Sequence, residues 1–147
     1  MKIKTILLLL IFSGLVFSQT KIEIKNAWVR PAAKGANSAL FLTIVNNGTS
    51  ADTLTAAESK LADIVAVHET FKKDNDKMGM REVEFVAVAA KSKIEFKPGS
   101  LHVMLIDTQK DFRIGDQLNA VLKFKHAGKI KVKAVVQDMP PASGMKH

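Results

Sequence analysis

Apolar and polar residues alternate along most of this chain, and a period of two predicts β-strands rather than helices. A clear case is 130–136, where Ile130, Val132 and Ala134 alternate with lysines. The strands expected on this criterion are 21–25, 39–45, 63–71, 82–88, 93–96, 101–106, 117–125 and 130–136. No stretch has the apolar period of a helix of normal length. Many short strands separated by turn residues are typical of an all-β fold, here an antiparallel Greek-key sandwich or barrel.

Residues 1–18 have the layout of a secretory signal peptide: a basic start, an aliphatic run, and the small residue Ser18 before Gln19. A membrane-spanning helix needs about 20 apolar residues, and polar residues end this run too early. We therefore expect an exported protein, periplasmic or otherwise, with no transmembrane anchor after processing. The expected organisation is a signal peptide at 1–18, a β domain at 19–137 and a flexible tail at 138–147.

The formal net charge of +8 falls to +6 when Lys2 and Lys4 leave with the signal peptide. The remaining lysines are spread along the expected strands, and the chain has one Trp and no Tyr. A surface on which nucleic-acid bases could stack is therefore not expected. A basic surface on an exported protein favours instead an acidic partner or a membrane surface.

The sequence also excludes several kinds of chemistry. It contains no Cys, and so it has no zinc-thiolate site, no disulfide, no thiol nucleophile and no lipid attachment at cysteine. It contains no nucleophile-elbow motif, no glycine-rich phosphate loop and no carboxylate pair in an acid/base setting. We expect that the protein is not an enzyme.

The expected strand 101–106 carries a His and a Met on one face. Period two sends Leu101, Val103 and Leu105 to the core face, so that His102 and Met104 share the opposite face. Taken alone, the pair is equally compatible with a surface histidine and a packing methionine.

His68 ends the apolar part of the expected strand 63–71. The polar stretch that follows predicts a hairpin loop, with Met78 and Met80 on the returning strand. If this loop turns symmetrically about Asp74, residue 68 pairs with residue 80. Directly opposed residues have Cβ atoms about 4.5–5.5 Å apart, so one ion could bridge His68 and Met80. Met78 would then face Thr70 and shield the site.

A site built from imidazole nitrogen and thioether sulfur favours Cu(I), because Mg, Ca and Mn prefer oxygen and structural zinc prefers thiolate. Without a Cys thiolate, a blue-copper electron-transfer site cannot form. The residues therefore predict a Cu(I) site at His68, His102 and Met104 with Met78 or Met80 as the fourth ligand. The symmetric hairpin favours Met80, with Met78 as a possible auxiliary ligand, whereas a one-residue shift of the turn would bring Met78 closer.

The spacing of these residues resembles that of the periplasmic PCuAC-type copper chaperones. In that family a His is followed by a Met after a short spacer, then by His-any-Met about twenty residues later. Here His68 is followed by Met80, and His102 and Met104 come after a further spacer. The family often has Met directly after the first His, where this chain has Glu69. Further segments that resemble the family are 27–30, 39–48, 98–104, 115–116 and 124–130.

The resemblance implies a cupredoxin-like β-barrel that binds Cu(I) near a surface edge. It implies a monomeric carrier that delivers copper to an accepting protein, the copper-bearing subunit of cytochrome oxidase with its dinuclear copper centre. Some family members have a tail that adds copper capacity, and Met139, Met145 and His147 are the corresponding candidate ligands here. Cu(II) is a further ion that such a tail could bind. The alternative is a β-sandwich interaction module in which the His and Met residues are incidental.

Overall fold

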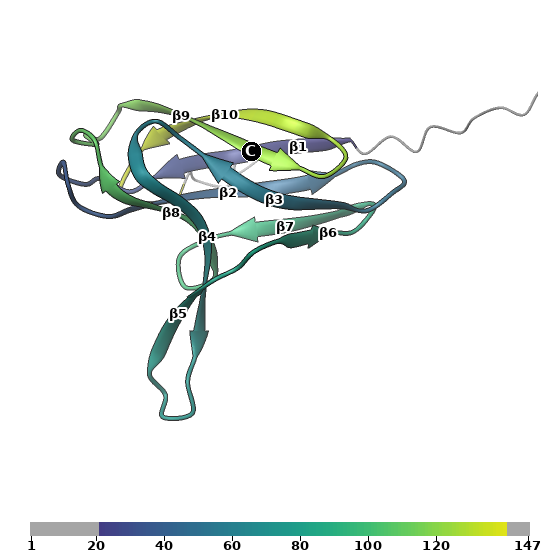
Figure 1. Ribbon diagram of the computed structural model, residues 1–147, viewed down its shortest axis with the longest axis horizontal. Coiled ribbons are helices and arrows are strands. Elements are labelled where there is room, and N and C mark those ends of the chain that lie inside the picture. Colours follow the sequence, from purple (N-terminus) through teal and green to yellow (C-terminus); the bar gives the residue numbers. More distant parts are fainter. Residues whose placement is uncertain (1–20, 141–147) are drawn as a thin grey trace, which may run out of the picture.

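The fold is all-β, as a computed structural model that describes residues 21–140 shows (Figure 1). Its ten strands are β1 (Ile22–Val29), β2 (Ser38–Asn46), β3 (Asp52–Glu58), β4 (Ala62–Lys72), β5 (Met78–Glu82), β6 (Val86–Val88), β7 (Ser92–Phe96), β8 (Leu101–Thr108), β9 (Gln117–Phe124) and β10 (Gly128–Val136). Within these 120 or so residues no helix is long and apolar enough to cross a membrane. The expected signal peptide at 1–18 lies outside the described residues.

The strands form one continuous, mostly antiparallel sheet in the order β5-β4-β8-β2-β1-β10-β9-β3-β6. The exception is β1, which pairs in parallel with β10. β2 is central because one of its edges pairs with β1, while its other edge pairs first with β8 and then with β7. The predicted cupredoxin-like, antiparallel β fold is confirmed, with one parallel pair that alternation alone could not reveal.

Two apolar clusters lie on opposite faces of β2. Leu40, Leu42 and Ile44 contribute to the main core, whereas Ala39 and Phe41 join Trp28 in a small second cluster. Burial of such side chains stabilises the fold by about 25 cal/mol per Å² of apolar surface removed from water. β2 is therefore buried on both faces, as its nearly continuous apolar sequence predicts.

A β-bulge in β1 supplies Trp28 to the second cluster. Lys25 pairs with Thr43 and Trp28 with Phe41, so β1 has one extra residue at this point. Asn26 lies in the bulge with a φ of 53°, a left-handed conformation that Asn tolerates better than most residues. The extra residue changes the face on which the following side chains lie, which places Trp28 against Phe41.

β4 is the longest strand, and its end leaves the body of the molecule. Residues 62–69 of β4 pair with β8, and residues 68–72 pair with β5. Figure 1 shows that the β4–β5 hairpin projects away from the other strands as an arm. His68 lies at the base of this arm, where both neighbouring strands pair with β4.

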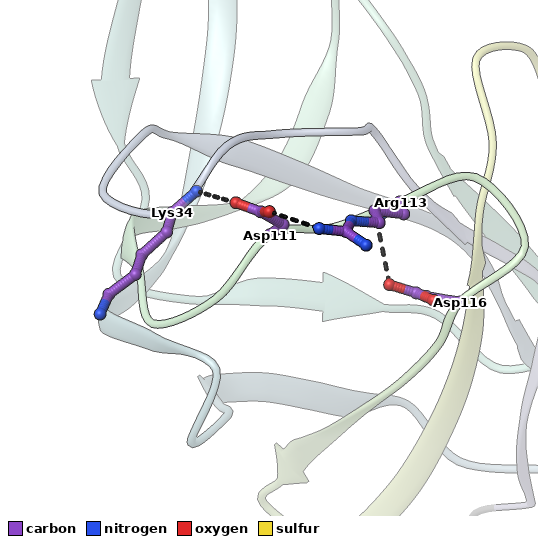
Figure 2. Close-up of polar contacts among 4 residues, drawn as sticks. All are labelled: Lys34, Asp111, Arg113 and Asp116. Carbon is purple, nitrogen blue, oxygen red and sulfur yellow. Dashed lines mark hydrogen bonds and ion pairs between the residues drawn. The ribbon is translucent and has the colours of Figure 1, made fainter.

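A polar network fixes the loops beside β1 and β8 (Figure 2). The backbone N–H of Lys34 donates to Asp111 at 3.0 Å, and the Arg113 guanidinium donates to the same carboxylate at 3.1 Å. The Lys34 hydrogen bond is the main cause of a lowered Asp111 pKa. The backbone N–H of Arg113 also donates to Asp116 at 3.0 Å. This network holds the 30–37 loop, which contributes Arg30 and Asn37 to the cavity described below.

Two strand predictions were incomplete. The single strand expected over 82–88 is divided, since β5 ends at Glu82 and β6 begins at Val86. β3 was not expected, and its bulge explains why: Leu54 pairs with Phe124 and Ala56 with Lys123, which puts one extra residue in β3. The buried residues of β3 therefore include Leu54 and Ala57, a spacing of three that hides the period of a strand.

Candidate metal centre

The outer face of β8 carries His102 and Met104, as the alternation predicted. On the other face Val103 and Leu105 are fully buried in the main core. Met104 lies between Ala39 on β2 and Ala66 on β4, its two cross-strand partners. Because both neighbours carry only a methyl group, the thioether of Met104 has room beside it.

The two histidines are direct cross-strand partners on β4 and β8. Their ring centroids are 6.1 Å apart and the ring planes differ by 24°. In each ring Nδ1 faces a backbone carbonyl two residues earlier: His102 faces Ser100 O at 2.9 Å, and His68 faces Ala66 O at a longer 3.4 Å. A carbonyl oxygen only accepts, so this contact favours the neutral tautomer with the proton on Nδ1, in which the Nε2 lone pair is free for a metal. Such a hydrogen bond to the second ring nitrogen orients metal-binding histidines generally.

A cavity of about 220 Å³ lies next to this pair. Met80, His102 and Met104 line it together with Thr70. His68 is not among the lining residues and reaches the site only through its position beside His102. The structure thus brings three of the four predicted ligands to one cavity and the fourth to its edge.

The predicted hairpin register was wrong by two residues. His68 pairs with Glu82 rather than with Met80, Met80 pairs with Thr70, and Met78 pairs with Lys72. The loop is centred on Asn75 instead of Asp74, because Lys73 bonds to Lys77 across a three-residue loop.

The backbone of Asp76 explains this loop. Its φ is 58°, and the Asp76 N–H donates to Lys73 O at 3.2 Å. A turn followed by one left-handed residue is a common three-residue hairpin connection. Met80 pairs with Thr70, which lies two residues after His68 and therefore on the same face of β4. The corrected register thus keeps Met80 on the face of His68, and it moves Met78 farther from the cavity, toward the tip of the hairpin.

Burial sets the electrostatics of His102. The residue is only 4% exposed, and this burial is the main cause of a lowered pKa for its imidazole, to which the charges of His68 and Arg30 add. The neutral ring, which is the form that binds a metal, is therefore favoured down to lower pH than in water.

An aromatic support lies beneath the site. Trp28 and Phe41 have ring centroids 4.6 Å apart, and Phe41 is 6.2 Å from the His102 ring. The Arg30 guanidinium lies 5.3 Å from the Phe41 ring centroid. Sequence reasoning missed Phe41, Ala39 and Ala66 as neighbours of the site, although the apolar residues on both faces of β2 were a sign of a second packed layer.

The donor set offers two imidazole nitrogens and two thioether sulfurs. A thioether and a metal-binding imidazole both carry no charge, so these donors would add no negative charge to a bound ion, and soft donors of this kind suit Cu(I). Among the described residues no three His or carboxylate side chains gather at one place. Of the predicted tail ligands, Met139 is exposed, and Met145 and His147 lie outside the described residues.

Known proteins resemble this chain in sequence and in fold. Residues 22–136 match the family described as "Putative lipoprotein LpqE-like". Among curated proteins, "Putative lipoprotein Lxx21020" of Leifsonia xyli subsp. xyli is 25% identical over 83% of this chain and 73% of its own length. "Uncharacterized protein RP573" of Rickettsia prowazekii is 26% identical over 73% of this chain, and the match spans 61% of its length.

Three solved structures share the fold. "Apo PCuAC domain from PmoF1" has a TM-score of 0.69 at 28% identity and covers 81% of this chain and 95% of its own. "Copper-bound PCuAC domain from PmoF2" has a TM-score of 0.67 at 24% identity, with 81% and 94% covered. "Solution structure of CuI-DR1885 from Deinococcus Radiodurans" has a TM-score of 0.60 at 21% identity, with 78% of each chain covered. The chain therefore belongs to the LpqE-like family, and its expected resemblance to the PCuAC-type copper chaperones is confirmed.

Proposed function

We propose that this protein is an exported copper carrier that holds one Cu(I) ion between His68, Met80, His102 and Met104. The observation that carries the proposal is the placement of His102, Met80 and Met104 around one cavity, with His68 paired to His102 across the strands. Two proteins of the same fold, the copper-bound PCuAC domain from PmoF2 and CuI-DR1885, add support.

The donor chemistry suits a carrier better than an enzyme. Neutral thioethers and imidazoles bind Cu(I) without thiolate, and they avoid the disulfide chemistry that thiols undergo in an oxidising compartment. A site at the edge of the molecule, with Met80 54% exposed, also leaves the ion accessible to a receiving protein.

The proposed destination is a copper enzyme, namely the copper-bearing subunit of cytochrome oxidase with its dinuclear centre. This part of the proposal rests on the resemblance to the PCuAC-type family, as does the monomeric state. Export is supported by the signal-peptide pattern of residues 1–18 and by the relatives described as lipoproteins. No Cys of this chain is available to carry a lipid.

The test is a titration of the chain from Gln19 with Cu(I) against a coloured Cu(I) chelator. We expect one equivalent of Cu(I) to be withheld from the chelator, and a hundredfold excess of Zn(II) not to displace it, because the site lacks thiolate and carboxylate donors. A matched control is Ile114→Leu, which changes an exposed apolar residue outside the cavity and leaves the binding unchanged. If the protein withholds no copper, the carrier role is wrong and an interaction module with incidental His and Met becomes the better interpretation.

A further inference from the structure

The β4–β5 arm has two unlike faces. On one face Met80 pairs with Thr70, and Met78 pairs with Lys72 one step nearer the tip. Both methionines are more than half exposed, Met80 at 54% and Met78 at 60%. Two thioethers therefore stand in a row in solvent, although methionine is a residue that proteins mostly bury.

The other face of the arm is packed by side-chain contacts between the two strands. Phe71 pairs with Gly79, and a Cβ built on Gly79 would lie 2.9 Å from the Phe71 ring and 2.6 Å from the Lys73 side chain. The Arg81 guanidinium lies 5.0 Å from the Phe71 ring centroid and donates twice to Glu69, at 2.7 and 3.0 Å. These contacts pack the face of the hairpin opposite the methionines, and Met78 and Met80 take no part in them.

Met78 lies just beyond the proposed copper site. Met80 lines the cavity and Met78 does not. Residues two apart on a strand are about 6.8 Å apart between their Cα atoms, so the second thioether is one side-chain step farther from the body of the protein. Lys72, the cross-strand partner of Met78, forms an ion pair with Asp76 at 2.6 Å, which partly offsets its positive charge.

We propose that Met78 is a transfer ligand that takes Cu(I) from Met80 and presents it to a copper-accepting protein docking at the arm. The inference rests on the proposed function of the cavity. In the step, one Cu–S bond to Met78 forms and one bond to a resident ligand breaks. Copper remains Cu(I), and no proton moves because a thioether is neutral in both states.

The advantage of such a ligand is its effective concentration. A thioether held one step from the ion acts at an effective concentration of about millimolar, as tethered groups generally do. A receiving protein at about micromolar concentration meets the ion far less often, so the first ligand exchange is faster through Met78 than by direct attack at the cavity. Met78 therefore affects the rate of delivery and leaves the equilibrium affinity to the four resident ligands.

The experiment compares four proteins: the chain from Gln19, Met78→Leu, Met80→Leu and the control Ile114→Leu, which changes an exposed residue outside the cavity. Each is loaded with one equivalent of Cu(I) and mixed in a stopped-flow instrument with a Cu(I) chelator coupled to a large dextran. Equilibrium affinity is measured separately with the free chelator. Leucine keeps the volume of methionine and removes the sulfur, so the hairpin is retained.

We expect the Cu(I) affinity of Met78→Leu to lie within about twofold of that of the unsubstituted chain. Its release of Cu(I) to the dextran-coupled chelator should be about tenfold slower, which is less than the full ratio between the millimolar effective concentration of Met78 and a micromolar acceptor. Ile114→Leu should match the unsubstituted chain in both measurements. If Met78→Leu releases copper at the normal rate, Met78 is not a transfer ligand. If it loses as much affinity as Met80→Leu, Met78 is a resident ligand and the inference is equally overturned. Failure of the unsubstituted chain to hold copper at equilibrium would instead refute the proposed function.

Discussion

Replacing His102 by Asn separates the structural role of this residue from its proposed role as a ligand. In the structure the His102 Nδ1–H donates to Ser100 O at 2.9 Å. The side-chain nitrogen of Asn occupies nearly the same place relative to the backbone, so His102→Asn keeps that donor. It removes Nε2, the nitrogen proposed to bind copper.

The expected loss of stability is small. The substitution removes about 40 Å³ of ring, which at about 24 cal/mol per Å³ of buried space costs about 1 kcal/mol. This figure is an upper one, because the vacated space joins a cavity of about 220 Å³ that water can enter. For a domain of this size a loss of 1 kcal/mol lowers Tm by about 4 °C. His102→Leu, which also leaves the Ser100 carbonyl without this donor, should cost about 1 kcal/mol more.

The expected loss of copper affinity is much larger. Even residues that only support a metal ligand weaken binding by about 10–100-fold when replaced, so loss of the ligand itself should cost at least about 100-fold, or about 2.8 kcal/mol. Thermal unfolding followed by circular dichroism and competition with a coloured chelator measure the two effects. An Asn variant that keeps full Cu(I) affinity would refute the assignment of His102, and one that fails to fold would refute the estimate of its structural role.

Two further predictions concern acid and the opposite end of the fold. Copper should leave the site as the pH falls, because both imidazoles must be neutral to bind, and affinity that stays flat down to about pH 4.5 would argue against histidine ligands. Burial lowers the pKa of His102, so as the pH falls below about 6.5 the imidazole takes up a proton more readily in the unfolded chain than in the folded one. The free energy of unfolding of the copper-free protein should therefore decrease. The urea midpoint, measured at two pH values, should fall more for the unsubstituted chain than for His102→Asn. Asp52, whose buried carboxylate accepts backbone N–H groups of His126 and Ala127 at 2.9 and 2.8 Å, stabilises the β9–β10 turn, and Asp52→Ala should lower the free energy of unfolding by about 3 kcal/mol. Copper affinity of the folded Asp52→Ala protein should be unchanged, and a stability loss below about 0.5 kcal/mol in urea denaturation would contradict this role.

The sequence predicted the β8 half of the site because a strand alternates its side chains without exception unless a bulge intervenes. His102 and Met104 therefore share a face whatever the rest of the chain does. The β4–β5 half was harder, because the pairing of a hairpin depends on which loop residue adopts a left-handed backbone. Asp76 does so, but the neighbouring Asp74 and Asn75 are chemically similar candidates, and the sequence did not distinguish them.

The packed layer behind the site was also beyond sequence reasoning. Trp28 faces Phe41 only because the bulge at Asn26 adds a residue to β1. The small neighbours of Met104 are even less visible, since Ala39 and Ala66 come from different strands and meet only through the sheet pairing. Alternation predicts which face a residue occupies, whereas the residues across the sheet depend on bulges and on strand order.

The position of the hairpin loop has a consequence for how such sites can diverge or be engineered. The spacing between His102 and Met104 is fixed, because one inserted residue would move one donor to the opposite face and two would separate the donors by about 6.8 Å more. The number of residues between His68 and Met80 can vary, because the Lys73–Lys77 loop at the tip can gain or lose residues without disturbing the pairing of Thr70 with Met80. A search for related proteins should therefore hold the His-any-Met spacing constant and let the first spacing vary. The arm could also be lengthened to reach a recessed acceptor while the ligand set stays intact.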